Sequence, residues 1–196
     1  MLAVNKSNIT GIILAGGESS RMGTDKGLLK LNNKPFTQYI IDALKPLVSE
    51  ILIVSDNLNY DDFGYKRIED IIKDAGPVSG IYSGLTHSKT DNNLVLSCDI
   101  PLISTEVLRW LIGHANDSCE VIQIESHGKT MPLIALYKKE CSNIFLSLLQ
   151  NGERRLRKAV SQCTIKTIKL DMDDHNVTAN VNTPQELKDI QDAYKY

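Results

Sequence analysis

Long apolar runs and an excess of either charge are both missing from this chain of 196 residues. Its apolar stretches, such as Ile12–Ala15, fall far short of the roughly 20 residues that a membrane-spanning helix needs. The net charge is −2, so bulk electrostatics favour neither nucleic acid nor an anionic membrane as a partner. Residues 1–10 lack the apolar segment of a secretory signal, and we expect a cytoplasmic protein without nucleic-acid or membrane partners.

Cysteine and histidine are scarce, and neither is spaced for metal or redox chemistry. No two cysteines form a C-x-x-C pair, so the pattern gives little support to a zinc or redox centre. The four histidines show no metal-ligand spacing either. We expect the cysteines to be reduced and to pack as small hydrophobic side chains. They are Cys98, Cys119, Cys141 and Cys163.

What the sequence does contain is an alternation of β-rich and helix-like segments. Several of the β-rich segments are apolar throughout and do not alternate strictly between apolar and polar residues, which is typical of strands buried on both faces. The β-α-β-α order predicts an α/β fold, with a mostly parallel sheet and helices on both faces. Neither a linker nor a low-complexity tract interrupts it, so residues 1–196 are predicted to form a single domain. Strands are expected at Ile9–Ala15, Glu50–Ser55, Tyr65–Glu69, Asn93–Cys98, Cys119–Glu125, Met131–Tyr137 and Thr164–Leu170, and helices at Pro35–Leu44, Val78–Ser88, 104–115, Lys138–Leu149, Glu153–Ser161 and from Pro184 onward.

A glycine-rich segment directly follows the first predicted strand, which is where α/β sheets bind their ligands. From Leu14 to Lys26 it reads L-A-G-G-E-S-S-R-M-G-T-D-K. Glycines let backbone N–H groups approach phosphate oxygens closely, while Arg21 and Lys26 add positive charge. The segment has neither the Walker A register nor G-x-G-x-x-G. A plain connecting loop is the alternative, but the spacing of Arg21, Gly23 and Lys26 favours a phosphate site.

This string resembles the signature of nucleotidyltransferases that make nucleoside-diphosphate conjugates, and most of all that of the molybdenum cofactor guanylyltransferases. The resemblance implies a three-layer α/β/α Rossmann-like nucleotidyltransferase fold. It also implies transfer of GMP from GTP to the terminal phosphate of molybdopterin, with release of pyrophosphate. The double glycine favours GMP over CMP transfer. Arg21 and Lys26 are the implied catalytic residues of the segment, and the implied nucleotide contacts are Leu14, Ala15, Gly16, Gly17 and Lys26.

A second motif, S-C-D-I-P at residues 97–101, ends another buried strand. It resembles the C-D-x-P metal site of the same family. Mg²⁺ keeps several waters and binds one or two carboxylates together with substrate phosphates, so a single aspartate suffices. Asp99 is therefore the predicted Mg²⁺ ligand, with catalytic and nucleotide-binding roles. The alternative role of Asp99 is a helix cap, but Ser104 already fills that role for the next helix.

Two further residues are predicted to meet the nucleotide. Asp70 directly follows the short predicted strand at Tyr65–Glu69 and resembles a family aspartate that faces guanine or ribose. A carboxylate suits guanine because it accepts from both N1–H and the 2-amino group. Gly80 lies in a G-P-x-x-G-I string that resembles a family turn at a helix start. The alternatives are a solvated loop residue or cap for Asp70, and helix–sheet packing for Gly80.

The acceptor is predicted to meet two polar segments near the end of the chain. Arg154 and Arg155 resemble a family G-x-R-[RS] segment, and arginine suits an acidic phosphorylated pterin. Asn180 and Asn182 resemble the family string N-x-N-T-P-E, except that Gln185 replaces the usual glutamate. The alternatives are a solvated helix start for the arginines and a turn before the last helix for the asparagines.

The predicted substrates are thus GTP and molybdopterin, with or without bound molybdenum, and the predicted cofactor is Mg²⁺. Other cofactor-biosynthesis proteins or acceptor molybdoenzymes are possible partners. Two alternatives stay open. One is transfer of CMP, or of another nucleotide to a sugar or polyol phosphate. The other is a nucleotide-binding regulator without turnover.

Overall fold

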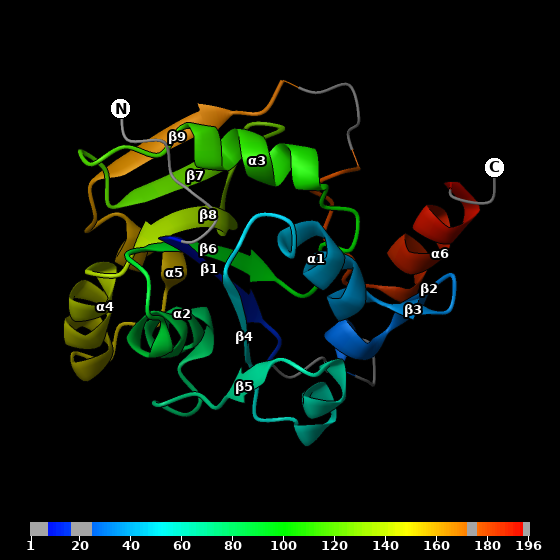
Figure 1. Ribbon diagram of the computed structural model, residues 1–196, viewed down its shortest axis with the longest axis horizontal. Helices are drawn as coiled ribbons and strands as arrows, with labels where there is room; N and C mark the ends of the chain where they lie inside the picture. Colours follow the sequence, from blue (N-terminus) through cyan, green and yellow to red (C-terminus); the bar gives the residue numbers. More distant parts are fainter. Residues whose placement is uncertain (1–7, 17–24, 172–175, 194–196) are drawn as a thin grey trace.

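The computed structural model describes residues 8–16, 25–171 and 176–193. A central seven-stranded sheet is covered by helices on both faces, and the last helix lies beside a small hairpin at one side (Figure 1). This arrangement confirms the predicted three-layer α/β/α fold. No helix within those ranges combines the length and the apolar character needed to cross a membrane.

The strand order of the sheet is β5-β4-β1-β6-β8-β7-β9. The neighbouring pairs are parallel except where β8 meets β6 and β7, so β8 runs opposite to the other six strands. The mostly parallel sheet was predicted. The strands are β1 (Ile9–Leu14), β4 (Glu50–Val54), β5 (Lys66–Ile68), β6 (Asn92–Ser97), β7 (Val121–Ser126), β8 (Lys129–Lys138) and β9 (Ile165–Lys169).

The helices divide between the two faces of the sheet (Figure 1). Helices α1 and α3 pack on one face, and α2, α4 and α5 pack on the other. Helix α6 packs with the small hairpin of β2 and β3. The helices are α1 (Phe36–Leu44), α2 (Gly76–His87), α3 (Thr105–Gly113), α4 (Cys141–Gln150), α5 (Leu156–Val160) and α6 (Pro184–Ala193).

The apolar run of β1 explains why the sheet carries helices on both faces. All six residues of β1 are buried. Side chains of a strand alternate between faces, and so Ile9 and Ile13 join the cluster under α1 and α3, while Ile12 and Leu14 join the cluster under α2 and α4. Burial on both faces places β1 at the centre of the sheet and leaves its carboxyl end at an edge shared with β4 and β6.

Several short elements were not predicted. Asn32 and Asn33 form the turn of a small hairpin between β2 (Lys30–Leu31) and β3 (Lys34–Pro35). Both asparagines have positive φ, 49° and 65°, as a tight two-residue hairpin requires. Two 3-10 helices, η2 (Lys26–Leu28) and η3 (Leu58–Phe63), were also missed.

Two predicted helices begin later than expected. The prediction of Lys138–Leu149 was wrong at its start, because β8 continues to Lys138, which pairs with Asn92 of β6. The prediction of Glu153–Ser161 was wrong at both ends. Helix α5 starts only after Arg155, whose backbone is extended, with φ −80° and ψ 110°.

Candidate nucleotide-binding site

The carboxyl ends of the parallel strands meet at one edge of the sheet. Backbone hydrogen bonds continue past the end of β1, from Ala15 N to Val54 O at 2.9 Å and from Cys98 N to Leu14 O at 3.0 Å. These bonds place the start of the glycine-rich segment between the ends of β4 and β6. A Cβ atom added at Gly16 would meet no heavy atom within 4 Å, so packing does not explain the glycine there. Gly17 and Arg21 lie outside the described residues.

Asp99 follows β6 and is held by two other segments of the chain. Its side chain is buried, with the residue only 8% exposed. The Ser97 hydroxyl donates to Oδ1 at 2.6 Å, and Asn180 Nδ2 donates to Oδ2 at 3.3 Å. The backbone N–H of Val181 also donates to the Asp99 carbonyl at 2.8 Å. The segment before α6 is therefore fixed against the end of β6.

Lys26 reaches the same point from the other side. Its Nζ donates to Asn182 Oδ1 at 2.5 Å and lies 3.7 Å from Asp99 Oδ2. A partly exposed ammonium and a mostly buried carboxylate thus lie side by side. Of the predicted site residues, the structure brings together Lys26, Asp99, Asn180 and Asn182, which are up to 156 positions apart in the sequence.

Asp25, the residue before Lys26, was not singled out in the sequence. Its carboxylate caps η2 by accepting from Gly27 N at 3.2 Å. It also accepts from Asn57 Nδ2 at 3.0 Å and from the hydroxyl of Tyr60. The sequence held no signal for the two partners in η3 and its cap, because they lie more than thirty positions further along the chain.

Asp70, Gly80 and Leu14 form a second group at this edge. A Cβ atom added at Gly80 would lie 3.2 Å from Leu14 Cδ2 and 3.8 Å from Asp70 Oδ1. Gly80 therefore lets α2 approach both β1 and Asp70 closely. Burial, and next the charge of Asp56, raise the pKa of Asp70, while hydrogen bonds from Ser79 and Ser83 lower it.

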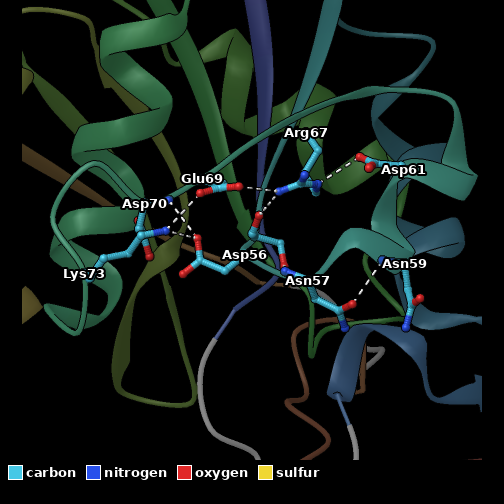
Figure 2. Close-up of polar contacts among 9 residues, drawn as sticks. Asp56, Asn57, Asn59, Asp61, Arg67, Glu69, Asp70 and Lys73 are labelled. Carbon is cyan, nitrogen blue, oxygen red and sulfur yellow. Dashed lines mark hydrogen bonds and ion pairs between the residues drawn. The ribbon is translucent and has the colours of Figure 1, made fainter.

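Charged side chains hold the loop that carries Asp70, as Figure 2 shows. Lys73 Nζ donates to Asp56 Oδ1 at 2.6 Å and to Glu69 Oε2 at 3.2 Å. Asp56 Oδ1 also accepts from the backbone N–H of Asp70 at 3.3 Å. Arg67 lies beside Glu69 and donates to Asp61 at 2.9 Å. Asp56 thus links the end of β4 to the loop after β5.

The two predicted acceptor arginines have contacts elsewhere. Arg154 donates to the Asp74 carbonyl at 2.8 Å, in the loop before α2. Arg155 forms an ion pair with Glu153, its Nε lying 2.8 Å from Oε1. Hydrogen bonds from Arg155 and Lys158 hold the pKa of Glu153 well below its usual range. These contacts attach Arg154 to the loop before α2 and Arg155 to Glu153 before α5, and not to the group around Lys26 and Asp99.

The donor set at Asp99 fits a magnesium ion that shares its ligands with a substrate. Within residues 8–16, 25–171 and 176–193, no cluster of three His, Cys, Asp or Glu side chains could hold a metal ion. A metal here would rely on Asp99, water and substrate oxygens, which is the pattern that Mg²⁺ adopts with phosphates. The Asp99 carboxylate is well placed for this role because its oxygens are oriented by Ser97 and Asn180.

A three-layer α/β/α fold in which Lys26, from η2 in the segment after β1, lies beside Asp99, just after β6, is the arrangement that the sequence motifs predicted for a nucleotidyltransferase. Residues 11–166 match the MobA-like NTP transferase domain. Over 182 residues the chain is 37% identical to a "probable molybdenum cofactor guanylyltransferase" of Flavobacterium johnsoniae, with 93% of this chain and 96% of the relative covered. The chain therefore belongs to the MobA-like NTP transferase family, as its motifs predicted.

Solved structures confirm the fold. Molybdopterin-guanine dinucleotide biosynthesis protein A from Archaeoglobus fulgidus superposes with a TM-score of 0.80 at 20% identity, over 94% of this chain and 97% of that chain. A 4-diphosphocytidyl-2C-methyl-D-erythritol synthase from Anaerococcus prevotii gives 0.76 at 11% identity, over 96% of each chain. Because proteins with different names share this fold so closely, the fold alone does not select the nucleotide.

Proposed function

We propose that this protein transfers GMP from GTP to the terminal phosphate of molybdopterin and releases pyrophosphate. The observation that carries the proposal is the contact between Lys26, at the start of η2, and Asp99, just after β6, whose Nζ and Oδ2 atoms lie 3.7 Å apart. A nucleotidyl transfer needs positive charge for the phosphates and a carboxylate for their metal ion at one point. The similarity to guanylyltransferases over nearly the whole chain supports the choice of guanine and molybdopterin.

In the proposed reaction, an oxygen of the molybdopterin phosphate attacks the α-phosphorus of GTP. The bond between that phosphorus and the bridging oxygen to the β-phosphate breaks, and pyrophosphate leaves. The attacking phosphate is already ionised near neutral pH, so positioning and charge stabilisation account for catalysis. Lys26 and Arg21 are the proposed cations for the phosphate charge, and the glycine-rich segment is the proposed source of backbone N–H donors to the phosphates.

Asp99 is the residue that would hold Mg²⁺. The ion would supply charge neutralisation at the α-phosphate and the leaving pyrophosphate. The hydrogen bonds from Ser97 and Asn180 orient the Asp99 carboxylate, and Lys26 offsets its charge before the nucleotide arrives. The protein thus contributes one oriented carboxylate, and the nucleotide contributes the remaining ligands.

Asp70 is the proposed guanine contact. Its carboxylate lies beside the close approach of Gly80 to Leu14, and it can accept from guanine N1–H and the 2-amino group. Asn180 and Asn182 contact Asp99 and Lys26, which supports a place for the acceptor phosphate beside them. We also propose that Arg154 and Arg155 contact the acceptor. The protein is further proposed to be cytoplasmic and to have partner proteins that deliver or receive the cofactor.

The test is pyrophosphate release with Mg²⁺ and molybdopterin, measured in parallel with GTP, CTP, UTP and ATP. We expect release with GTP at least tenfold faster than with the others. Thermal unfolding gives an independent readout, since GTP at 100 times its Kd should raise the Tm by roughly 5–10 °C. Faster release with CTP would support cytidylyl transfer instead, and GTP binding without release would support a regulator.

A further inference from the structure

The carboxylate of Asp25 has no part in the proposed chemistry, yet it accepts hydrogen bonds from three donors. One is the backbone N–H of Gly27 within η2, at 3.2 Å. The other two are Asn57 Nδ2, at 3.0 Å, and the Tyr60 hydroxyl, both from the segment that begins η3. Asp25 thus joins the turn that carries Lys26 to a 3-10 helix following β4.

Tyr60 is a rigid anchor for this contact. Its side chain is fully buried, and its ring stacks on Phe63 with centroids 5.8 Å apart. Burial, and next the proximity of Cys98, raise the pKa of the Tyr60 hydroxyl, so the group remains a protonated donor at physiological pH. A buried hydroxyl that donates to a carboxylate has little freedom to move, because losing the bond would leave both groups unsatisfied.

Packing fixes the same turn from its other side. The Thr37 hydroxyl of α1 donates to the Gly27 carbonyl at 2.9 Å. A Cβ atom added at Gly27 would overlap the hydroxyls of Tyr60 and Thr37. The backbone directly after Lys26 is therefore enclosed between η3 and α1, and its position depends on both.

The side chain of Lys26 benefits from this fixed backbone. A lysine has four rotatable side-chain bonds, and orienting its ammonium costs rotamer entropy. Here Nζ is already directed to Asn182 and Asp99, which reduces the reorganisation needed when a phosphate arrives. Asp25 is the point at which that orientation is tied to the protein core.

We propose that Asp25 is a positioning residue for Lys26, held in place by Tyr60 and Asn57. The inference rests on the proposed function, because the phosphates that Lys26 meets are those of GTP. Residues just after β4 then hold in place the proposed contacts to both the base and the phosphates of the nucleotide. Asp56 holds the loop of Asp70, and the next residue, Asn57, holds Asp25.

The test is a double-mutant cycle on GTP affinity, built from Tyr60→Phe, Lys26→Ala and the double variant. Tyr60→Phe removes one hydroxyl and should raise the Kd for GTP about tenfold, the loss typical of a hydrogen bond to a charged group. In the Lys26→Ala background the same change should raise the Kd less than about twofold. Asp25→Asn provides a second route to the same cycle if Tyr60→Phe does not fold.

Tyr137→Phe is the matched control. Tyr137 is also fully buried, and its hydroxyl donates to the Pro132 carbonyl at 2.8 Å, among the side chains packed under α2 and α4. Both changes should lower the Tm, but only Tyr60→Phe should alter GTP affinity. An equal effect of the two tyrosine changes on the Kd would overturn the inference, because the role of Tyr60 would then be structural alone.

The double-mutant cycle and the pyrophosphate-release assay together distinguish a failure of this inference from a failure of the proposed function. If wild-type protein binds GTP and the effects of Tyr60→Phe and Lys26→Ala simply multiply, Asp25 does not act through Lys26 and the inference is wrong. If wild-type protein binds GTP but releases no pyrophosphate with molybdopterin, the proposed function fails, and the cycle still decides the inference. Wild-type protein that does not bind GTP would contradict both.

Discussion

Asp99 and Asp70 occupy equivalent places in the fold and have opposite surroundings. Each follows the carboxyl end of a parallel strand, β6 for Asp99 and β5 for Asp70. Asp99 has donors on both carboxylate oxygens and the Lys26 ammonium 3.7 Å away. Asp70 receives a long hydrogen bond of 3.4 Å from Ser83, and it lies near the like charge of Asp56.

The difference indicates two different tasks. A carboxylate whose oxygens are oriented by hydrogen-bond donors suits a ligand of a metal ion. A half-buried carboxylate with a raised pKa gains more from a partner that brings its own donors, as guanine does. In the proposed function the two aspartates therefore bind different parts of the nucleotide, Asp99 the phosphates through a metal ion and Asp70 the base.

Removing the charge of Asp99 should have the largest effect. In Asp99→Asn we expect kcat to fall about a thousandfold, because the variant loses the carboxylate that is proposed to hold the metal ion at the transferred phosphate. The Tm should change little, since the amide keeps the size of the side chain. Turnover is measured by pyrophosphate release with GTP, Mg²⁺ and molybdopterin.

Asp91→Asn is the matched control, because Asp91 lies just before the same strand, where it is exposed and ion-paired with Lys138. It should keep turnover within about twofold of wild type, as surface ion pairs contribute little. If Asp99→Asn kept a tenth of the wild-type turnover, the proposed role of Asp99 at the phosphates would be wrong.

A change of base specificity should follow from Asp70→Asn. The amide would present a donor to the 2-amino group of guanine, and the Kd for GTP should rise about 10- to 100-fold. Xanthine carries an oxygen at that position, so XTP should bind the variant more tightly than GTP. Titration of both nucleotides measures the reversal. Weaker binding of GTP and XTP alike would place Asp70 at the ribose instead of the base.

Asp70→Asn should also stabilise the ligand-free protein. The pKa of Asp70 is raised on folding, so ionisation above that pKa lowers the stability of the native state, and this effect is relieved as the pH falls through it. The neutral amide removes the effect at neutral pH. A higher Tm together with weaker GTP binding is the pattern expected of a residue kept for function.

Much of the fold could be predicted from the sequence because it depends on local patterns. The apolar run of β1 and the Ser104 cap of α3, which accepts from Val107 N at 3.3 Å, are encoded within a few residues. The strand-end rule then placed Lys26 and Asp99 at one edge. The start of α4 was mispredicted because β8 gains pairing with Asn92, a partner that no local pattern reveals.

The sequence motifs singled out Lys26 and Asp99, which lie together in the structure, but did not predict the contacts that hold them. Asn180 and Asn182 were predicted to meet the acceptor, and that role stays a prediction, whereas the contacts of their amide groups with Asp99 and Lys26 were not predicted. The bond between Tyr60 and Asp25 joins residues 35 positions apart. Such contacts depend on how η3 packs against the sheet. No periodic pattern in a single sequence predicts packing between segments that are far apart in the chain.

The smallest expected effect concerns Ser83, whose hydroxyl donates to Asp70 and so lowers the pKa of that carboxyl. Ser83→Ala should raise the pKa of Asp70 further. The proposed contact with guanine needs the ionised carboxylate, so the loss of GTP affinity on acidification should begin at a higher pH in the variant. At neutral pH the Kd should change less than about twofold, because the wild-type bond is long.

GTP titrations from neutral to mildly acidic pH measure this shift, with Thr86→Ala as the control. Thr86 lies on the same helix, and its hydroxyl donates to the Tyr82 carbonyl at 2.8 Å, away from Asp70. Its pH profile should follow that of wild type. An identical profile in Ser83→Ala would mean that protonation of Asp70 does not control GTP affinity. The preference of Asp70→Asn for XTP over GTP would then be the remaining test of a role for Asp70 at the base.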